Sequence, residues 1–150
     1  VTRKITRAVA EIYLNKRNFF FLGNLDAKRD WGYAKDYVES MWLMLQQKKP
    51  DDYVIATGKS CSVRKFVEKS FKVIGIDIGW RGKGIDEVGY NKASKKLLIK
   101  IDKNYFRPNE VHDLRGESKK AKKILKWTPK TSLDQMIKEM VLYDIEKIRN

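Results

Sequence analysis

The sequence contains very little cysteine and histidine: Cys61 and His112 are the only ones among 150 residues. A single cysteine excludes an internal disulfide and fits a reducing compartment such as the cytoplasm. One cysteine and one histidine also nearly exclude the usual zinc sites, so we expect no metal. No apolar run is long enough to span a membrane, and there is no signal peptide or glycosylation sequon. We therefore expect a soluble cytoplasmic protein with no membrane partner.

The positive charge is large but evenly spread. The formal net charge is +14, which by itself would favour nucleic acid or an acidic membrane as a partner. Residues 1–75 hold 15 Lys/Arg and 8 Asp/Glu, and residues 76–150 hold 18 and 11, so each half has the same surplus. Only the run KKAKK at residues 119–123 is a cluster, and it lies on an expected helix surface. A nucleic-acid-binding module is therefore an alternative, and we do not expect nucleic acid as the main partner.

Composition favours one globular domain, since 42% of the residues are apolar and 11% are aromatic. The chain starts at Val1 and enters a helical pattern almost at once, with Ile5, Ala8, Val9 and Ile12 on one face. No initiator methionine, leading strand or Gly-rich turn precedes this pattern. We therefore expect a piece of a longer protein.

Helical and strand patterns alternate over the first half of the chain. After the first helix, a continuously apolar strand is expected at 19–22, then a helix from Tyr33 to about Gln47, then a second strand at 53–56. The expected buried face of the second helix consists of Ala34, Tyr37, Val38, Met41, Trp42 and Leu45. A third helix follows the N-cap Ser62 and ends at Gly75. This alternation predicts an α/β fold with parallel strands.

The second half contains short glycine-rich strands and then two helices. Strands are expected near 78–80, 87–90 and 97–101, with a hairpin turn at NKASKK, and helices over 118–125 and from Ser132, where Gln135 completes a capping box. The two buried strands at 19–22 and 53–56 cannot by themselves cover several amphipathic helices. Their partner strands are therefore expected from residues outside this chain or from another copy.

The stretch RDWGYAKDYVESMW, residues 29–42, places a cation, a carboxylate and an aromatic before a helix. A helix N-terminus attracts anions, so Arg29 would complete a site for a phosphate or diphosphate. Asp30 would cap the helix or brace the guanidinium, and Trp31 would close the apolar side. The alternative is that Arg29 pairs with Asp26 or Asp30 on the surface, which is common.

Two further candidates lie elsewhere. In YFRPNE, residues 105–110, Pro108 should hold Arg107 extended, so that Arg107 could bind a second phosphate while Glu110 accepts hydrogen bonds from sugar hydroxyls. The alternative is a turn with a solvated ion pair. Lys4 lies near the start of the first helix, where a lysine usually just faces solvent.

Several strings resemble the C-terminal half of the GDP-mannose 4,6-dehydratases, in the extended short-chain dehydrogenase/reductase group, over essentially the whole chain. In order, they are DAKRDWGYAKDYVESMWLMLQ, YVIATG at 53–58, SVRKFVE at 62–68, YFRPNEV at 105–111 and AKKILKWTP at 121–129. RDW and LxWxP are shared by the whole group of nucleotide-sugar enzymes. NLDAKRDWG and YFRPxEV are narrower and point to this family.

The resemblance implies the C-terminal part of an NAD(P)-binding Rossmann-type fold, with the last parallel strands at about 19–22 and 53–56, plus a small α/β substrate-binding domain. It implies an enzyme that dehydrates GDP-mannose to GDP-4-keto-6-deoxymannose, with NADP as cofactor, and assembly into a dimer or tetramer. Arg29 and Arg107 would bind the diphosphate and nearby ribose, Glu110 a ribose hydroxyl, and Val1 and Lys4 the guanine end.

The sequence departs from the family pattern at two positions outside the chemistry: Tyr33 replaces the usual histidine after RDWG, and Lys126 the residue before the tryptophan of LxW. The Gly-rich dinucleotide turn, the YxxxK pair and the catalytic Thr and Glu are absent from these 150 residues. We therefore expect the catalytic and cofactor-binding residues upstream, and an inactive fragment that binds nucleotide weakly. Another nucleotide-sugar epimerase or dehydratase is the nearest alternative.

Overall fold

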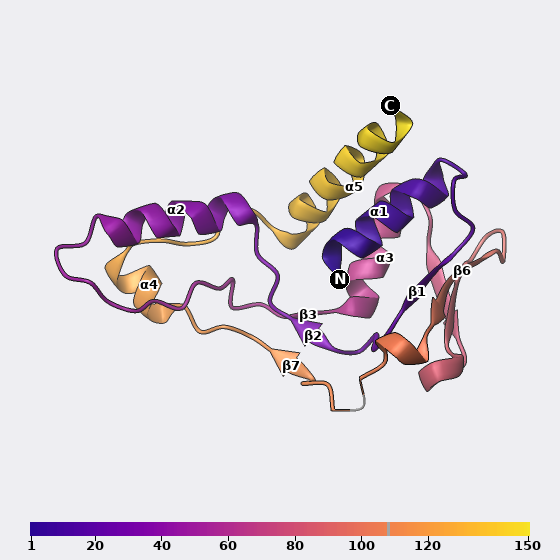
Figure 1. Cartoon of the computed structure of the whole chain (residues 1–150), viewed down its shortest axis with the longest axis horizontal. Coiled ribbons are helices and arrows are strands. Elements are labelled where there is room, and N and C mark those ends of the chain that lie inside the picture. The colour runs from indigo at the N-terminus through magenta and orange to yellow at the C-terminus, as the bar shows by residue number, and fades with distance from the viewer. Residues whose placement is uncertain (108) are drawn as a thin grey trace. The chain divides into compact units, whose positions relative to one another are not determined.

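The computed structural model describes residues 1–107 and 109–150 and divides the chain into two compact units (Figure 1). The first unit comprises Val1–Ala27, Ser62–His112 and Ile137–Asn150. The second unit comprises Lys28–Cys61 and Asp113–Met136. The mixed α/β architecture with parallel strands confirms the predicted fold class.

A four-stranded sheet with the order β1-β6-β5-β4 forms the base of the first unit. Its strands are β1 (Phe20–Leu22), β4 (Ile78–Arg81), β5 (Val88–Asn91) and β6 (Leu97–Ile101). β1 runs parallel to β6, whereas β5 is antiparallel to both β4 and β6. The strand predicted at 19–22 is therefore confirmed as β1. The expectation that its partners lie outside the chain is wrong for one side of β1, because β6 pairs with it there.

Helices α1 (Thr2–Tyr13) and α3 (Val63–Val73) lie against one face of this sheet (Figure 1). The phenyl rings of Phe20 and Phe71 stack at 6.4 Å between β1 and α3. The predicted apolar face of α1 is confirmed, since Ile5, Ala8, Val9 and Ile12 are all buried. The later turns of α5 (Leu133–Arg149) complete the unit, and the Thr6 hydroxyl donates to buried Asp144 at 2.7 Å.

Local signals set the element boundaries as predicted. The Ser62 hydroxyl caps α3 by accepting from the Lys65 amide at 3.2 Å, and Gly75 has the positive φ of +74° expected after a helix. Ser132 and Gln135 form the reciprocal capping box of α5. Two short 3-10 helices, η1 (Gly84–Asp86) and η2 (Lys103–Tyr105), precede β5 and follow β6.

The second unit contains α2 (Ala34–Leu45), α4 (Lys119–Ile124) and a small sheet. Its strands have the order β3-β2-β7 and are β2 (Lys28–Arg29), β3 (Cys61–Ser62) and β7 (Asp113–Leu114). The buried core is Trp127 with Ala121 and Leu125. The partly buried side chains packed around this core are Tyr37, Leu43, Met44, Tyr53 and Ile55.

The face of α2 that packs inward differs from the predicted one. The helix buries Asp36 and Ser40 and turns Tyr37 onto the Trp127 ring, with ring centroids 6.0 Å apart. The expectation is thus confirmed for Tyr37. Four of the other expected inner residues instead form an exposed row, with exposed fractions of 61% for Val38, 59% for Met41, 60% for Trp42 and 82% for Leu45. We call these four residues the α2 stripe. Their spacing is that of one helix face, as predicted, but the described residues of this unit do not cover that face.

The strand predicted at 53–56 is also not formed within the described part of the chain. The segment is extended and rests on the core through Tyr53 and Ile55, while Val54 is 55% exposed. A strand needs a hydrogen-bonding neighbour. The described residues supply none here, so the segment stays single.

Asp36 joins α2 to the chain before α5. Its buried carboxylate accepts from the amides of Lys130 at 3.0 Å and Thr131 at 2.9 Å, and its carbonyl accepts from the Trp127 indole at 2.8 Å. One turn later, Glu39 contacts the ammonium of the same Lys130, but this pair is solvent-exposed. A buried acceptor of two main-chain donors stabilises far more than an exposed ion pair.

We predict that Asp36→Ala lowers the free energy of unfolding by about 1–3 kcal/mol, because two partly buried main-chain amides lose their buried acceptor. Glu39→Ala, the matched control on the same helix, should cost less than about 0.5 kcal/mol. Urea unfolding followed by tryptophan fluorescence would measure both. Equal effects of the two substitutions would contradict this account of Asp36.

Candidate functional site

Arg29 does not sit at a helix start. It lies in β2 and precedes the first residue of α2, Ala34, by five positions, and the N-cap of α2 is Tyr33. The expected combination of a guanidinium and a helix N-terminus is therefore wrong for Arg29. β2 pairs in parallel with β7, where Arg29 lies opposite Leu114, and one guanidinium nitrogen donates to the Lys28 carbonyl at 2.7 Å. A strand thus positions this half-buried arginine.

Asp30 anchors the second unit and does not cap α2. Its carboxylate accepts hydrogen bonds from the Thr57 amide at 3.1 Å, the Thr57 hydroxyl at 2.5 Å and the Gly58 amide at 2.8 Å. It also accepts from the Gly116 amide at 3.3 Å. One carboxylate therefore gathers two separate loops next to Arg29. Because a carboxylate has about four lone-pair sites, these four bonds saturate it.

Arg107 projects from an irregular segment whose main chain is held by a side chain. The Asn24 amide donates to the Arg107 carbonyl at 3.0 Å, and the Asn24 side-chain oxygen accepts from the Arg107 amide at 2.8 Å. Arg107 itself is exposed. Pro108, which the sequence analysis expected to stiffen this segment, lies outside the described residues. Asn24 therefore bonds to both main-chain polar groups of Arg107.

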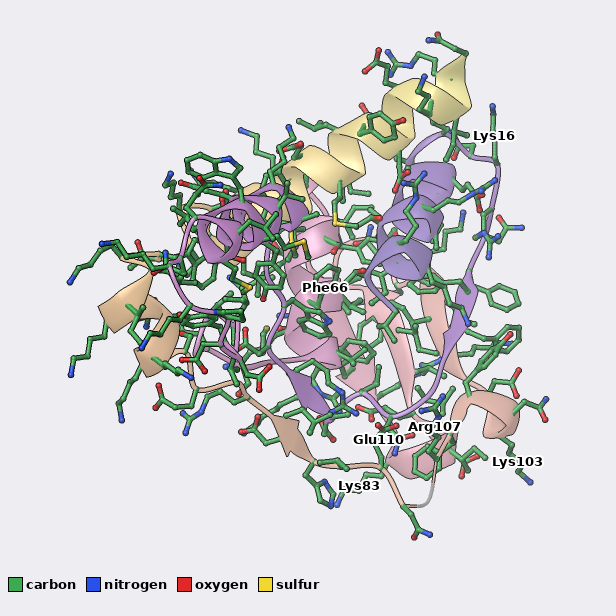
Figure 2. All side chains as sticks on the ribbon, turned by 60° about the vertical axis from the view of Figure 1, so that its left-hand side comes forward. Lys16, Phe66, Lys83, Lys103, Arg107 and Glu110 are labelled. Atoms are coloured by element: carbon green, nitrogen blue, oxygen red, sulfur yellow. The ribbon has the colours of Figure 1, made fainter. Side chains whose placement is uncertain are left out.

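A cleft of about 220 Å³ borders this segment within the first unit. It is lined by Gly23, Asn24, Leu25, Asp26, Ala27, Gly84, Glu87, Ile101, Phe106, Glu110 and His112. The Glu110 amide donates to the Arg107 carbonyl at 3.3 Å, and Figure 2 shows the two residues beside each other. Glu110 therefore lines a small cleft, and exposed Arg107 adjoins it through the main chain. That chemistry suits a ligand with both hydroxyl and phosphate groups.

Arg64 balances two of the acidic groups on the cleft. Its guanidinium lies 2.9 Å from Asp26 and 2.5 Å from Glu87. It also lies 4.9 Å from the ring centroid of Trp80. Hydrogen bonding to Glu87 raises the pKa of Arg64, against the opposing effect of burial, and Asp26 adds to the rise. The single charge of Arg64 is shared between Asp26 and Glu87, so it offsets one of the three carboxylate charges of the cleft.

Lys4 and Val1 lie at the start of α1. The Val1 carbonyl accepts from the Ile5 amide at 3.1 Å. The Val1 side chain is 67% exposed. The Lys4 ammonium lies 3.5 Å from the centroid of the Tyr105 ring. Burial lowers the pKa of Lys4, with Asp102 acting in the opposite direction and Arg17 in the same direction. Lys4 thus contacts the segment that carries Arg107.

The structure brings four of the five predicted site residues into one unit. Val1, Lys4, Arg107 and Glu110 belong to the first unit, whereas Arg29 belongs to the second. A pocket shared by Arg29 and Arg107 therefore stays a prediction. Sequence reasoning missed Asn24 as a contributor, although an asparagine after a strand and a glycine commonly bonds to nearby main chain.

The described residues do not form a cradle for a dinucleotide. Gly79 lies within β4, and Gly82 and Gly84 lie in the turn before antiparallel β5, so no glycine-rich turn links a parallel strand to an α-helix. No cluster of His, Cys, Asp or Glu in the described ranges could hold a metal ion. Residues 1–107 and 109–150 also contain no helix with the length and hydrophobicity of a membrane span.

The family model and the curated relatives point to one family. The family model for GDP-mannose 4,6 dehydratase matches residues 1–140. A GDP-mannose 4,6 dehydratase from Dictyostelium discoideum is 58% identical over 150 residues, which is 100% of this chain and 42% of that protein. The human protein of the same name is 56% identical over 149 residues, covering 99% of this chain and 40% of its own length. The chain therefore spans about two fifths of these curated relatives.

A solved structure supports the fold. The structure of RMD from Pseudomonas aeruginosa complexed with NADPH superimposes with a TM-score of 0.76 at 16% identity, covering 97% of this chain and 42% of that one. At this identity the likeness concerns the fold alone. It agrees with the Rossmann-type α/β class predicted from the sequence.

We predict that Asp30→Asn loosens the loops that the carboxylate holds. An amide can accept on its oxygen only, and its NH₂ group would face main-chain donors, so at least one partly buried donor loses its partner. Amide hydrogen exchange at Thr57, Gly58 and Gly116 should accelerate by about 10- to 100-fold, the equivalent of roughly 1.4–3 kcal/mol of local opening. Asp52→Asn, an exposed control in the same unit, should leave these rates unchanged. Unaltered exchange in the Asp30 variant would refute the anchoring role.

Proposed function

The chain belongs to the GDP-mannose 4,6-dehydratase family, and we propose that it supplies the nucleotide-sugar-binding part of an enzyme that converts GDP-mannose to GDP-4-keto-6-deoxymannose. The observation that supports this most directly is the rim of the 220 Å³ cleft, where exposed Arg107 adjoins Glu110. A guanidinium pairs well with a phosphate, and a carboxylate with sugar hydroxyls.

Each predicted site residue has one role in this proposal. Arg107 and Arg29 bind the diphosphate, and Glu110 accepts a hydrogen bond from a ribose hydroxyl. Lys4 donates to the guanine end, next to Val1. The contact between Lys4 and Tyr105 supports this division, because it places the ammonium beside the same segment as Arg107.

The remaining three fifths of the relatives' length would provide the catalytic residues and the NADP-binding Rossmann sheet. Two features of the second unit support this. The α2 stripe is apolar and exposed, and the segment at 53–56 is extended without a neighbouring strand in the described residues. A sheet from the rest of the protein would cover the stripe and pair with the segment. A cytoplasmic homo-oligomer, dimer or tetramer, completes the proposal.

We predict that a chimera carrying the upstream part of the Dictyostelium relative joined to this chain will dehydrate GDP-mannose. The product should be lighter by one water molecule, and mass spectrometry of the nucleotide sugar would detect it. UDP-glucose should remain unconverted in the same assay. Turnover of UDP-glucose in place of GDP-mannose would instead support another nucleotide-sugar enzyme of the group.

The two arginines can be tested in the same chimera. Arg29→Met and Arg107→Met should each weaken GDP-mannose binding by about 2 kcal/mol or more, because each leaves a phosphate without its bidentate partner. Arg81→Met, which removes an exposed arginine from β4, should have little effect. Losses that depend only on net charge, and not on position, would contradict the proposed roles and favour general polyanion binding.

The α2 stripe predicts a solution property of the 150-residue chain. An exposed apolar row should bind the dye 8-anilinonaphthalene-1-sulfonate. The double substitution Trp42→Glu with Met41→Lys removes about half of the row, so it should reduce the fluorescence of bound dye by roughly half or more. Leu142→Glu, a single exposed apolar residue of α5, serves as the control. Joining the upstream part should abolish dye binding at the stripe without any substitution. Persistent dye binding in the chimera would exclude this surface as the contact.

A further inference from the structure

The end of β1 and the turn after it hold the segment that carries Arg107. The Asp102 amide donates to the Leu22 carbonyl at 2.9 Å, and Asn24 makes its two hydrogen bonds to the Arg107 main chain. Between them, Gly23 packs so tightly that a Cβ there would lie 1.9 Å from the Tyr105 carbonyl oxygen. Three consecutive residues, Leu22, Gly23 and Asn24, therefore contact the main chain of residues 102–107.

Arg107 lies outside any helix or strand of the described chain, since η2 ends at Tyr105 and β7 begins at Asp113. Besides the Glu110 amide, which donates to the Arg107 carbonyl at 3.3 Å, the Asn24 side chain restrains the main chain of Arg107, and ordering one residue costs about 1–2 kcal/mol. The Asn24 side chain offers a donor and an acceptor together, as a neighbouring strand would. It thereby fixes the point from which the exposed guanidinium extends.

We propose that Asn24 is a positioning residue: by pinning the Arg107 main chain, it sets the guanidinium in place for the diphosphate of a guanine nucleotide. This inference rests on the proposed function, because it takes Arg107 as a phosphate ligand. Asn24 acts through Arg107 and does not itself need to touch the nucleotide. Its contribution to binding therefore exists only while Arg107 is present.

The test is a double-mutant cycle on the 150-residue chain, with GDP as the probe and NMR titration as the measurement. Asn24→Ala should raise the dissociation constant for GDP about tenfold, since a displaced guanidinium loses its paired bonds to phosphate. In the Arg107→Met background, Asn24→Ala should change it by less than about twofold, because no guanidinium remains to be positioned. A merely structural asparagine would weaken GDP binding equally in both backgrounds.

Two further variants keep the result interpretable. Asn24→Asp retains the size and the acceptor for the Arg107 amide but sets a carboxylate oxygen against the Arg107 carbonyl, so it should weaken GDP binding at least as much as Asn24→Ala. Asn91→Ala is the matched control: Asn91 also orders main chain in this unit, by accepting from the Ala93 and Ser94 amides in the β5–β6 turn. It should leave GDP affinity unchanged while lowering stability.

The outcomes separate this inference from the proposed function. If the native chain shows no GDP-dependent shifts, the proposed nucleotide site fails and the role of Asn24 fails with it. If the native chain binds GDP and Asn24→Ala binds equally well, the site stands and the positioning role is wrong. An equal loss with and without Arg107, or a comparable loss for Asn91→Ala, would also overturn the positioning role.

Discussion

A single polar side chain can fix a loop that has no regular hydrogen-bonding neighbour, and both predicted phosphate-binding arginines depend on this. In the second unit, the Asp30 carboxylate binds the amides of Thr57, Gly58 and Gly116 beside Arg29. In the first unit, the Asn24 amide binds the main chain of Arg107 itself. Both anchors are short side chains with two polar atoms, so they hold main chain at close range and with defined direction. The arginines can then extend from positions that are already ordered.

The sequence predicted best those features that depend on neighbours along the chain. The Ser62 cap, the Ser132–Gln135 capping box and the hairpin after Asn91 each need only a few adjacent residues, and all three are present. The buried face of α1 was also predictable, because its apolar residues occupy one face. α2 carries apolar residues on two sides: Leu43 and Met44 pack with Tyr37 on the Trp127 core, whereas the α2 stripe is exposed. No local pattern could reveal which side packs inward.

The candidate site shows the same contrast between features set by adjacent residues and contacts between residues far apart in sequence. Residue type and the family resemblance singled out Arg29, Arg107 and Glu110, but not the contacts that hold them. The position of Arg29 before α2 was misjudged, because periodicity does not locate the first helical residue and Asp30–Tyr33 remain outside the helix. Asn24 is separated from Arg107 by 83 positions in sequence. Such a pairing depends on the β1–β6 register, which two isolated strand patterns do not specify.

The α2 stripe has a consequence for how such a protein is made. If the surface that covers Val38, Met41, Trp42 and Leu45 is encoded upstream, it leaves the ribosome first and can fold before α2 emerges. The stripe would then be covered during translation and would have little time to meet other nascent chains. Synthesised without that upstream part, the same helix would present four apolar side chains to the chaperones of the cell.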